Sequence, residues 1–128
     1  MNLTSFFAVG TGAFAGAVVR WLLAIALNPV VPSLPLGTLA ANLVGGLIMG
    51  VALGVFEHYE TLSLAWRLAI VTGFLGGLTT FSTFSGETVL LFLRHQYGWA
   101  AAVIVSHVLG SLLLTLAGIG LVRLVLRA

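Results

Sequence analysis

Residues 72–87 read TGFLGGLTTFSTFSGE and lie inside a hydrophobic segment that is long enough to cross a bilayer. Hydrocarbon offers backbone polar groups no hydrogen-bond partners, so irregular backbone at membrane depth persists only inside protein or beside a cavity. Here glycines and hydroxyl residues interrupt the apolar run, and Phe81 and Phe84 stand among the hydroxyls. This combination indicates a permeation site rather than a plain membrane anchor.

The composition of the whole chain indicates an integral membrane protein. Of its 128 residues, 60% are hydrophobic and 6% are charged, and the mean hydropathy of +1.20 is far above that of soluble domains. The basic residues are scattered arginines, so the high pI does not indicate a nucleic-acid partner. The lack of cysteine excludes disulfides, zinc–thiolate sites and cysteine nucleophiles. The N-terminus has no basic region and too long an apolar run for a signal peptide, so we expect no cleavage.

Hydropathy predicts an all-α protein with four transmembrane helices and a single four-helix transmembrane domain over residues 1–128. Each predicted helix reaches the roughly 20 residues that cross the hydrocarbon core. The breaks between them carry prolines or charged residues and are too short to fold separately. Any function must therefore lie within the bilayer. The predicted spans are 6–27, 36–56, 68–93 and 99–124.

Arginine placement predicts an antiparallel, dual-topology homodimer. An even number of spans puts both termini and the 57–67 loop on one side, with Arg67, Arg123 and Arg127. The other side carries Arg94, together with Arg20 if its side chain reaches the nearer interface. Orientation in a membrane follows a clear Lys/Arg bias between sides, which is almost absent here. We therefore expect insertion in both orientations, with a two-fold axis in the membrane plane.

Polar residues within spans two and four each have two interpretations. Asn42, with Thr38 four residues earlier on the same face, either bonds a neighbouring helix or offers an N–H donor to an anion. His107, Ser111 and Thr115 recur every four residues, and they either join helices or line a water-filled path. No metal-ligand partner for His107 is evident in the sequence, so we predict no metal site there.

Charged residues within spans one and three also have two interpretations. Arg20 either extends its guanidinium to the interface near Asn28 or attracts anions at the mouth of a vestibule. Glu87 is either an interfacial or hydrogen-bonded packing carboxylate or a buried group that carries a proton. Arg20, Glu87 and His107 are therefore candidate pathway residues.

Phe81 and Phe84 are the strongest candidates for direct contact with an ion. They share a helical face and are surrounded by hydroxyl residues. A phenyl ring has a positive edge, which solvates a small anion without holding it as tightly as a fixed charge. Conduction needs such moderate binding.

The third span is predicted to break in mid-membrane at residues 76–79, GGLT. Unwound backbone exposes carbonyl oxygens, which are hard ligands for a cation such as sodium. A simple glycine kink is the alternative interpretation, and the residues alone favour it.

Residues 73–85, GFLGGLTTFSTFS, and residues 37–43, GTLAANL, resemble the fluoride channel family (Fluc, also called CrcB). Gly110-Ser111 and Arg20-Trp21 add to the resemblance, which covers essentially the whole chain. It implies a dual-topology antiparallel dimer with two fluoride pathways.

The resemblance also implies roles for individual residues. It places the pore phenylalanines of the family on Phe81 and Phe84 and the pore asparagine on Asn42. Further polar pathway positions fall on Ser111, Thr38 and Glu87. The backbone carbonyls of Gly76 and Thr79 correspond to the ligands of a structural sodium ion at the dimer interface. Val103 falls where some members carry a tyrosine, so the path beside span four differs there.

The expected function is passive, fluoride-selective efflux across the inner membrane of a bacterium, without enzymatic activity. The alternative is a small proton-coupled multidrug antiporter, which needs a membrane-embedded carboxylate. A third possibility is an accessory subunit that transports nothing. It leaves the hydroxyl-rich stretch of span three unexplained.

Overall fold

The structure, a computed structural model, describes residues 1–127, and these residues form helices and connections without any strand. Four helical segments are long and apolar enough to cross a membrane. The all-α, four-span prediction is therefore confirmed, and each segment runs a few residues beyond its predicted bounds at one or both ends. The elements are α1 (Leu3–Leu27), the 3₁₀ turn η1 (Asn28–Val30), α2 (Leu36–His58), α3 (Leu64–Arg67), the π-helix η2 (Leu68–Leu75), α4 (Gly76–Leu78), α5 (Phe81–Leu93) and α6 (Tyr97–Leu126).

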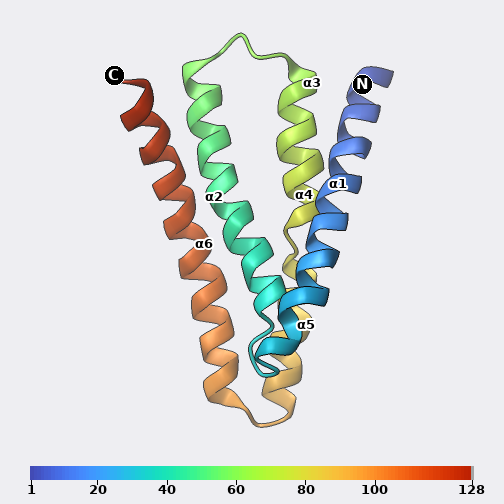
Figure 1. Cartoon of the computed structure of the whole chain (residues 1–128), viewed down its shortest axis with the longest axis vertical. Coiled ribbons are helices and arrows are strands. Elements are labelled where there is room, and N and C mark those ends of the chain that lie inside the picture. The colour runs from blue at the N-terminus through green and yellow to red at the C-terminus, as the bar shows by residue number, and fades with distance from the viewer. Residues whose placement is uncertain (128) are drawn as a thin grey trace.

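The helices stand side by side in an elongated bundle. Both termini lie at the end that also holds the α2–α3 connection, as the even number of spans predicts (Figure 1). The turn from α5 to α6 closes the opposite end. Helix α2 packs along α6, and α1 packs along η2 and α4. The third span therefore lies between α1 and the α2–α6 pair.

Glycines allow the helices in both pairs to approach closely. A Cβ atom on Gly16 of α1 would collide with the backbone of Phe74, and one on Gly50 of α2 would lie 3.0 Å from the Cα atom of Gly118 in α6. Small residues at such crossings are typical of membrane helix pairs. The glycines at these two positions therefore allow close helix packing.

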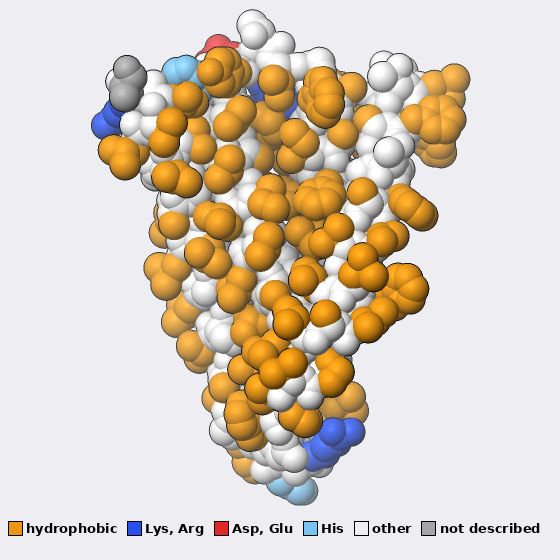
Figure 2. Space-filling model, viewed as in Figure 1, with side chains coloured by type: hydrophobic (Ala, Val, Ile, Leu, Met, Phe, Trp, Pro, Cys, Tyr) orange, Lys and Arg blue, Asp and Glu red, His pale blue; other side chains and the backbone are white. Residues whose placement is uncertain are grey.

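The interior is small and the outer surface is apolar. Two buried clusters make up the core, one around Phe84 and Val103 and the other around Ala41, Leu75 and Leu78. Hydrophobic side chains cover the length of the visible face, while charged side chains gather at its two ends (Figure 2). An apolar surface of this extent suits lipid or another membrane-embedded chain rather than water.

The third span changes course between α4 and α5. Thr79 (φ −87°, ψ 155°) and Thr80 (φ −149°, ψ 113°) are extended, whereas residues 76–78 are helical in α4. Thr79 is the last residue of the predicted GGLT break, and Thr80 is the residue that follows it. Residues 76–78 stay helical, and the glycine there serves helix packing, because a Cβ on Gly77 would collide with the backbone of Ala13 in α1. Gly77 therefore allows α1 to pack closely against α4, while Thr79 and Thr80 adopt the extended conformation.

Candidate functional site

Asn42 of α2 holds the extended backbone at Thr80. Its Oδ1 atom accepts from the Thr80 N–H at 2.8 Å, and its Nδ2 atom donates to the Thr80 carbonyl at 3.2 Å. Thr80 in turn begins α5, because its hydroxyl accepts from the Thr83 N–H at 3.1 Å. Capping of this kind supplies a partner that the first turn of a helix lacks. The interhelical interpretation of Asn42 is therefore confirmed.

His107 of α6 connects Asn42 to the aromatic residues of α5. Its Nδ1 atom lies 3.0 Å from Asn42 Nδ2, and its ring centroid lies 4.7 Å from that of Phe84. The residue is only 4% exposed, and its Nε2 atom has no hydrogen-bond partner among the described residues. One buried imidazole thus contacts both an amide and a phenyl ring.

Phe81 and Phe84 form an edge-to-face pair whose ring centroids lie 5.6 Å apart at an angle of 61°. Phe84 is 8% exposed and packs in the core, whereas Phe81 is 78% exposed in the single chain. The pair therefore extends from the core of the bundle to its surface. The ring edge of one residue points toward the face of the other, as their quadrupoles favour.

Thr38 and Glu87 form a second polar contact, between α2 and α5. The Thr38 hydroxyl donates to Glu87 Oε1 at 2.7 Å, and Thr38 itself is 3% exposed. Asn28 Oδ1 accepts from the backbone N–H groups of Gly37 and Thr38, which fixes the start of α2. Glu87 Oε2 is buried without a partner among the described residues.

Arg20 of α1 contacts the third span. Its Nε atom donates to the carbonyl of Gly77 in α4 at 2.9 Å. Neither interpretation of Arg20 predicted this contact, which joins a charged side chain to backbone close to the extended threonines. A backbone partner on another helix leaves no trace in a single sequence.

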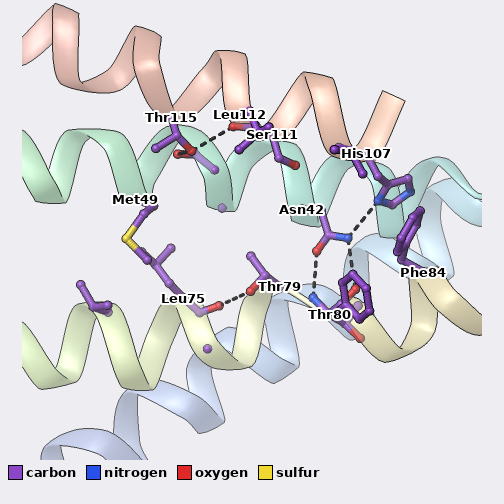
Figure 3. A pocket seen from close by; sticks show the side chains of 16 residues that line it. Asn42, Met49, Leu75, Thr79, Thr80, Phe84, His107, Ser111, Leu112 and Thr115 are labelled. Atoms are coloured by element: carbon purple, nitrogen blue, oxygen red, sulfur yellow. Dashed lines mark hydrogen bonds between the residues drawn. The ribbon is translucent and has the colours of Figure 1, made fainter. Parts of the chain in front are cut away.

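A groove of about 470 Å³ opens where α2, the third span and α6 meet, and Figure 3 shows the side chains around it. Among the residues that the structure describes, no Asp, Glu, Lys or Arg lines this groove. The predicted stripe of α6 faces it, although the Thr115 hydroxyl is bonded to the carbonyls of Gly46 and Ser111. Seven of the candidate residues line the groove, and these are Asn42, Gly76, Thr79, Phe81, Phe84, His107 and Ser111.

Three candidates lie outside the lining of the groove, namely Thr38, Glu87 and Arg20. Glu87 is one helical turn beyond Phe84 on α5, so the Thr38–Glu87 pair lies further along the same span. Thr80 lines the groove and fixes Asn42, although the sequence did not single it out. Thr80 could have been identified from its position in the sequence, directly after the predicted break and directly before Phe81.

Comparison with known proteins identifies the family. Residues 7–119 match the family described as CrcB-like protein, Camphor Resistance (CrcB). This chain belongs to the CrcB family. CrcB relatives named "Fluoride-specific ion channel FluC" include those of Nitrosospira multiformis (54% identical over 123 residues, 96% of each chain) and Ralstonia pickettii (55% over 123 residues, 96% of this chain and 98% of the relative). The relative of the same name in Chromobacterium violaceum is 58% identical over 115 residues, which cover 90% of this chain and 91% of that one.

Membership of the CrcB family confirms the resemblance that the sequence motifs indicated. The family match covers the whole of the second and third spans and most of the first and fourth. The relatives are ion channels by name, and the four apolar segments of this chain make it a multi-pass membrane protein.

Proposed function

We propose that this protein is a fluoride-selective channel through which fluoride passively leaves the bacterial cytoplasm across the inner membrane. The observation that carries the proposal is the uncharged groove lined by Phe81, Phe84, Asn42, His107 and Ser111 in a CrcB-family chain. The names and bacterial sources of the relatives support the ion and the location. Fluoride that enters a cell as HF dissociates there, and a negative membrane potential drives the anion out.

The ion pathway follows the phenylalanine pair. Ring edges and neutral donors replace part of the hydration shell of the ion without a fixed positive charge that would retain it. Ser111 supplies a hydroxyl within the groove, and Thr38 and Glu87 continue the pathway one turn beyond Phe84. No covalent bond forms or breaks, so the protein is not an enzyme.

Arg20 has a supporting role at the edge of this pathway. Its guanidinium is held by the Gly77 carbonyl, so its charge lies near the extended threonines but outside the groove lining. From there it attracts anions toward the pathway without binding them directly.

The channel is an antiparallel homodimer with two pathways. In a single chain the groove is open on one side, and Phe81 exposes most of its ring. A second copy across a two-fold axis in the membrane plane covers these surfaces, and it completes both pathways at once. The nearly even placement of arginines supports insertion in both orientations.

A structural sodium ion at the dimer interface fits the carbonyl groups at the α4–α5 interruption. The Thr80 N–H bonds Asn42, so the Gly76 carbonyl lacks the donor that a continuous helix supplies, and the backbone of Thr79 is extended. Both residues line the groove. Carbonyl oxygens suit a hard cation. A sodium ion held by the carbonyls of Gly76 and Thr79 would supply positive charge at the interruption, where Asn42 fixes the backbone.

The proton-coupled antiporter is the alternative. It needs a carboxylate that exchanges protons for a cationic substrate inside the membrane. Glu87 is the only acid within the four predicted spans, and its Oε1 atom is bonded to Thr38 outside the groove lining. This arrangement favours the channel.

Efflux from proteoliposomes tests the proposal. Vesicles loaded with equal fluoride and chloride are diluted into impermeant salt with a potassium ionophore, and each anion is followed with its own electrode. A channel of this kind releases fluoride rapidly and retains chloride. Equal release of both anions, or none from folded protein, contradicts the proposal.

A further inference from the structure

A second pocket lies between the C-terminal ends of α2 and α6, which finish at the same end of the bundle (Figure 1). Its volume of about 450 Å³ is within the usual range of ligand-binding pockets. It shares no lining residue with the groove described above, so it is a separate site. The residues that line it are Gly54, Glu57, His58, Val122, Arg123, Leu126 and Arg127.

The length of α6 places its last turns at the level of the lipid headgroups. Its 30 residues extend over about 45 Å, whereas the hydrocarbon core of a bilayer is about 30 Å thick. Arg123 is the first Lys, Arg, Asp or Glu in this helix. A long basic side chain near a helix end reaches the interface with its charged group while its stem stays among apolar atoms. The pocket is therefore at headgroup depth.

Arg123 has more hydrogen-bond donors than the fold uses. A guanidinium carries five N–H groups. Among residues 1–127, only the Nη2 atom of Arg123 is bonded, to the two carboxylate oxygens of Glu57 at 3.1 and 3.2 Å. Arg127 lies one helical turn later on the same face of α6 and lines the same pocket. Two guanidinium groups thus meet at one pocket, and one of them has unused donors.

The charges of the pocket favour an anion, and its apolar residues favour a lipid. The two arginines are opposed by one acid, Glu57, which is already paired with Arg123. Guanidinium groups bind phosphate oxygens through pairs of hydrogen bonds. Gly54, Val122 and Leu126 belong to the membrane-spanning segments and line the same pocket. A ligand with a phosphate and a hydrocarbon chain matches both parts of this lining.

We propose that this pocket binds the headgroup of an anionic phospholipid and that Arg123 and Arg127 contact its phosphate. Glu57 competes with the phosphate for Arg123, so the lipid exchanges with the bilayer. The site does not depend on which ion the protein conducts, because it shares no residue with the groove. In an antiparallel pair of chains, each leaflet contains one such site.

A simpler role for the two arginines is to offset the partial negative charge at the C-terminal ends of α2 and α6. That role stabilises the protein in every lipid. A headgroup site stabilises it only where anionic lipid is present, so a comparison between lipids separates the two roles.

Native mass spectrometry with equal amounts of phosphatidylglycerol and phosphatidylcholine tests the site. We expect the wild type to retain phosphatidylglycerol in preference. The double variant Arg123→Gln/Arg127→Gln should retain at least about fivefold less of it, since one arginine contributes about this factor near an anionic surface. Arg94→Gln, exposed at the opposite end, is the matched control and should behave as the wild type. Equal retention of both lipids by the wild type, or unchanged retention by the double variant, overturns the proposal.

Excess inorganic phosphate distinguishes a lipid site from a site for free phosphate. It should not displace phosphatidylglycerol, because free phosphate cannot occupy the apolar part of the lining. Displacement of the lipid would show that the pocket takes phosphate alone, and this overturns the lipid assignment.

Thermal unfolding in detergent micelles with added lipid is the second measurement. Phosphatidylglycerol should raise the unfolding temperature of the wild type by mass action more than phosphatidylcholine does, and the double variant should lose this difference. The same unfolding temperature of the wild type in both lipids would leave the arginines only their role at the helix ends, which overturns the proposal. If the double variant does not fold, Glu57→Gln decides. It removes the competing acid and should retain more phosphatidylglycerol than the wild type, and equal or lower retention contradicts the site.

Discussion

Replacing Asn42 with alanine should destabilise the protein because this one side chain joins three segments. It makes three hydrogen bonds, two with the Thr80 backbone at 2.8 and 3.2 Å and one with His107 at 3.0 Å. Polar contacts between membrane helices contribute about 0.6 kcal/mol on average and up to about 1.7 kcal/mol. Three such contacts give about 2 kcal/mol, and the unpaired Thr80 groups raise the expected loss to about 2–4 kcal/mol.

Unfolding in mixed detergent micelles, followed by far-UV circular dichroism, measures this loss. Ser106→Ala is the matched control, because the Ser106 hydroxyl donates to carbonyls of its own helix, at Ala102 and Val103. We expect the control to change the free energy of unfolding by less than about 0.5 kcal/mol. If Asn42→Ala is no more destabilising than Ser106→Ala, then Asn42 does not hold the interruption and our reasoning about the site is wrong.

Three further sets of measurements test other parts of the account. Phe81→Ile and Phe84→Ile should each lower fluoride efflux at least about tenfold while cross-linking still detects dimers; normal efflux from both would remove the ring-edge mechanism. Gly50→Leu should destabilise the protein by about 1–3 kcal/mol or more through the α2–α6 pair, whereas Gly10→Ala in α1, where a Cβ meets nothing within 4 Å, should not destabilise the protein. Replacing sodium with N-methylglucamine should lower the thermal unfolding temperature by mass action, and an unchanged temperature would argue against a sodium site at Gly76 and Thr79.

The sequence predicted the spans well because membrane insertion depends on local composition. About 20 consecutive apolar residues identify a span without knowledge of its neighbours. Gly16 and Gly50 also belong to runs of small residues spaced by four, a pattern that is visible within a single helix.

The site was predicted only in part, because its contacts join residues far apart in the chain. Asn42 and Thr80 are 38 residues apart, and Asn42 and His107 are 65 apart. The sequence placed a polar amide in span two but left open what it bonds. The contact of Arg20 with the Gly77 carbonyl was missed for the same reason, since a backbone acceptor carries no residue signature. The sequence predicted an interruption at residues 76–79, whereas the extended residues are Thr79 and Thr80. Glycines are found both where helices unwind and where helices pack closely, so Gly76 and Gly77 alone did not locate the interruption.

The reversal potential of a planar bilayer containing the protein tests the central claim most directly. With equal sodium on both sides and fluoride in tenfold gradient against an impermeant anion, a fluoride-selective channel reverses near the fluoride equilibrium potential, about 59 mV in magnitude. Exchanging the impermeant anion for chloride should leave that value unchanged. A reversal potential that moves toward zero when chloride is added would contradict fluoride selectivity.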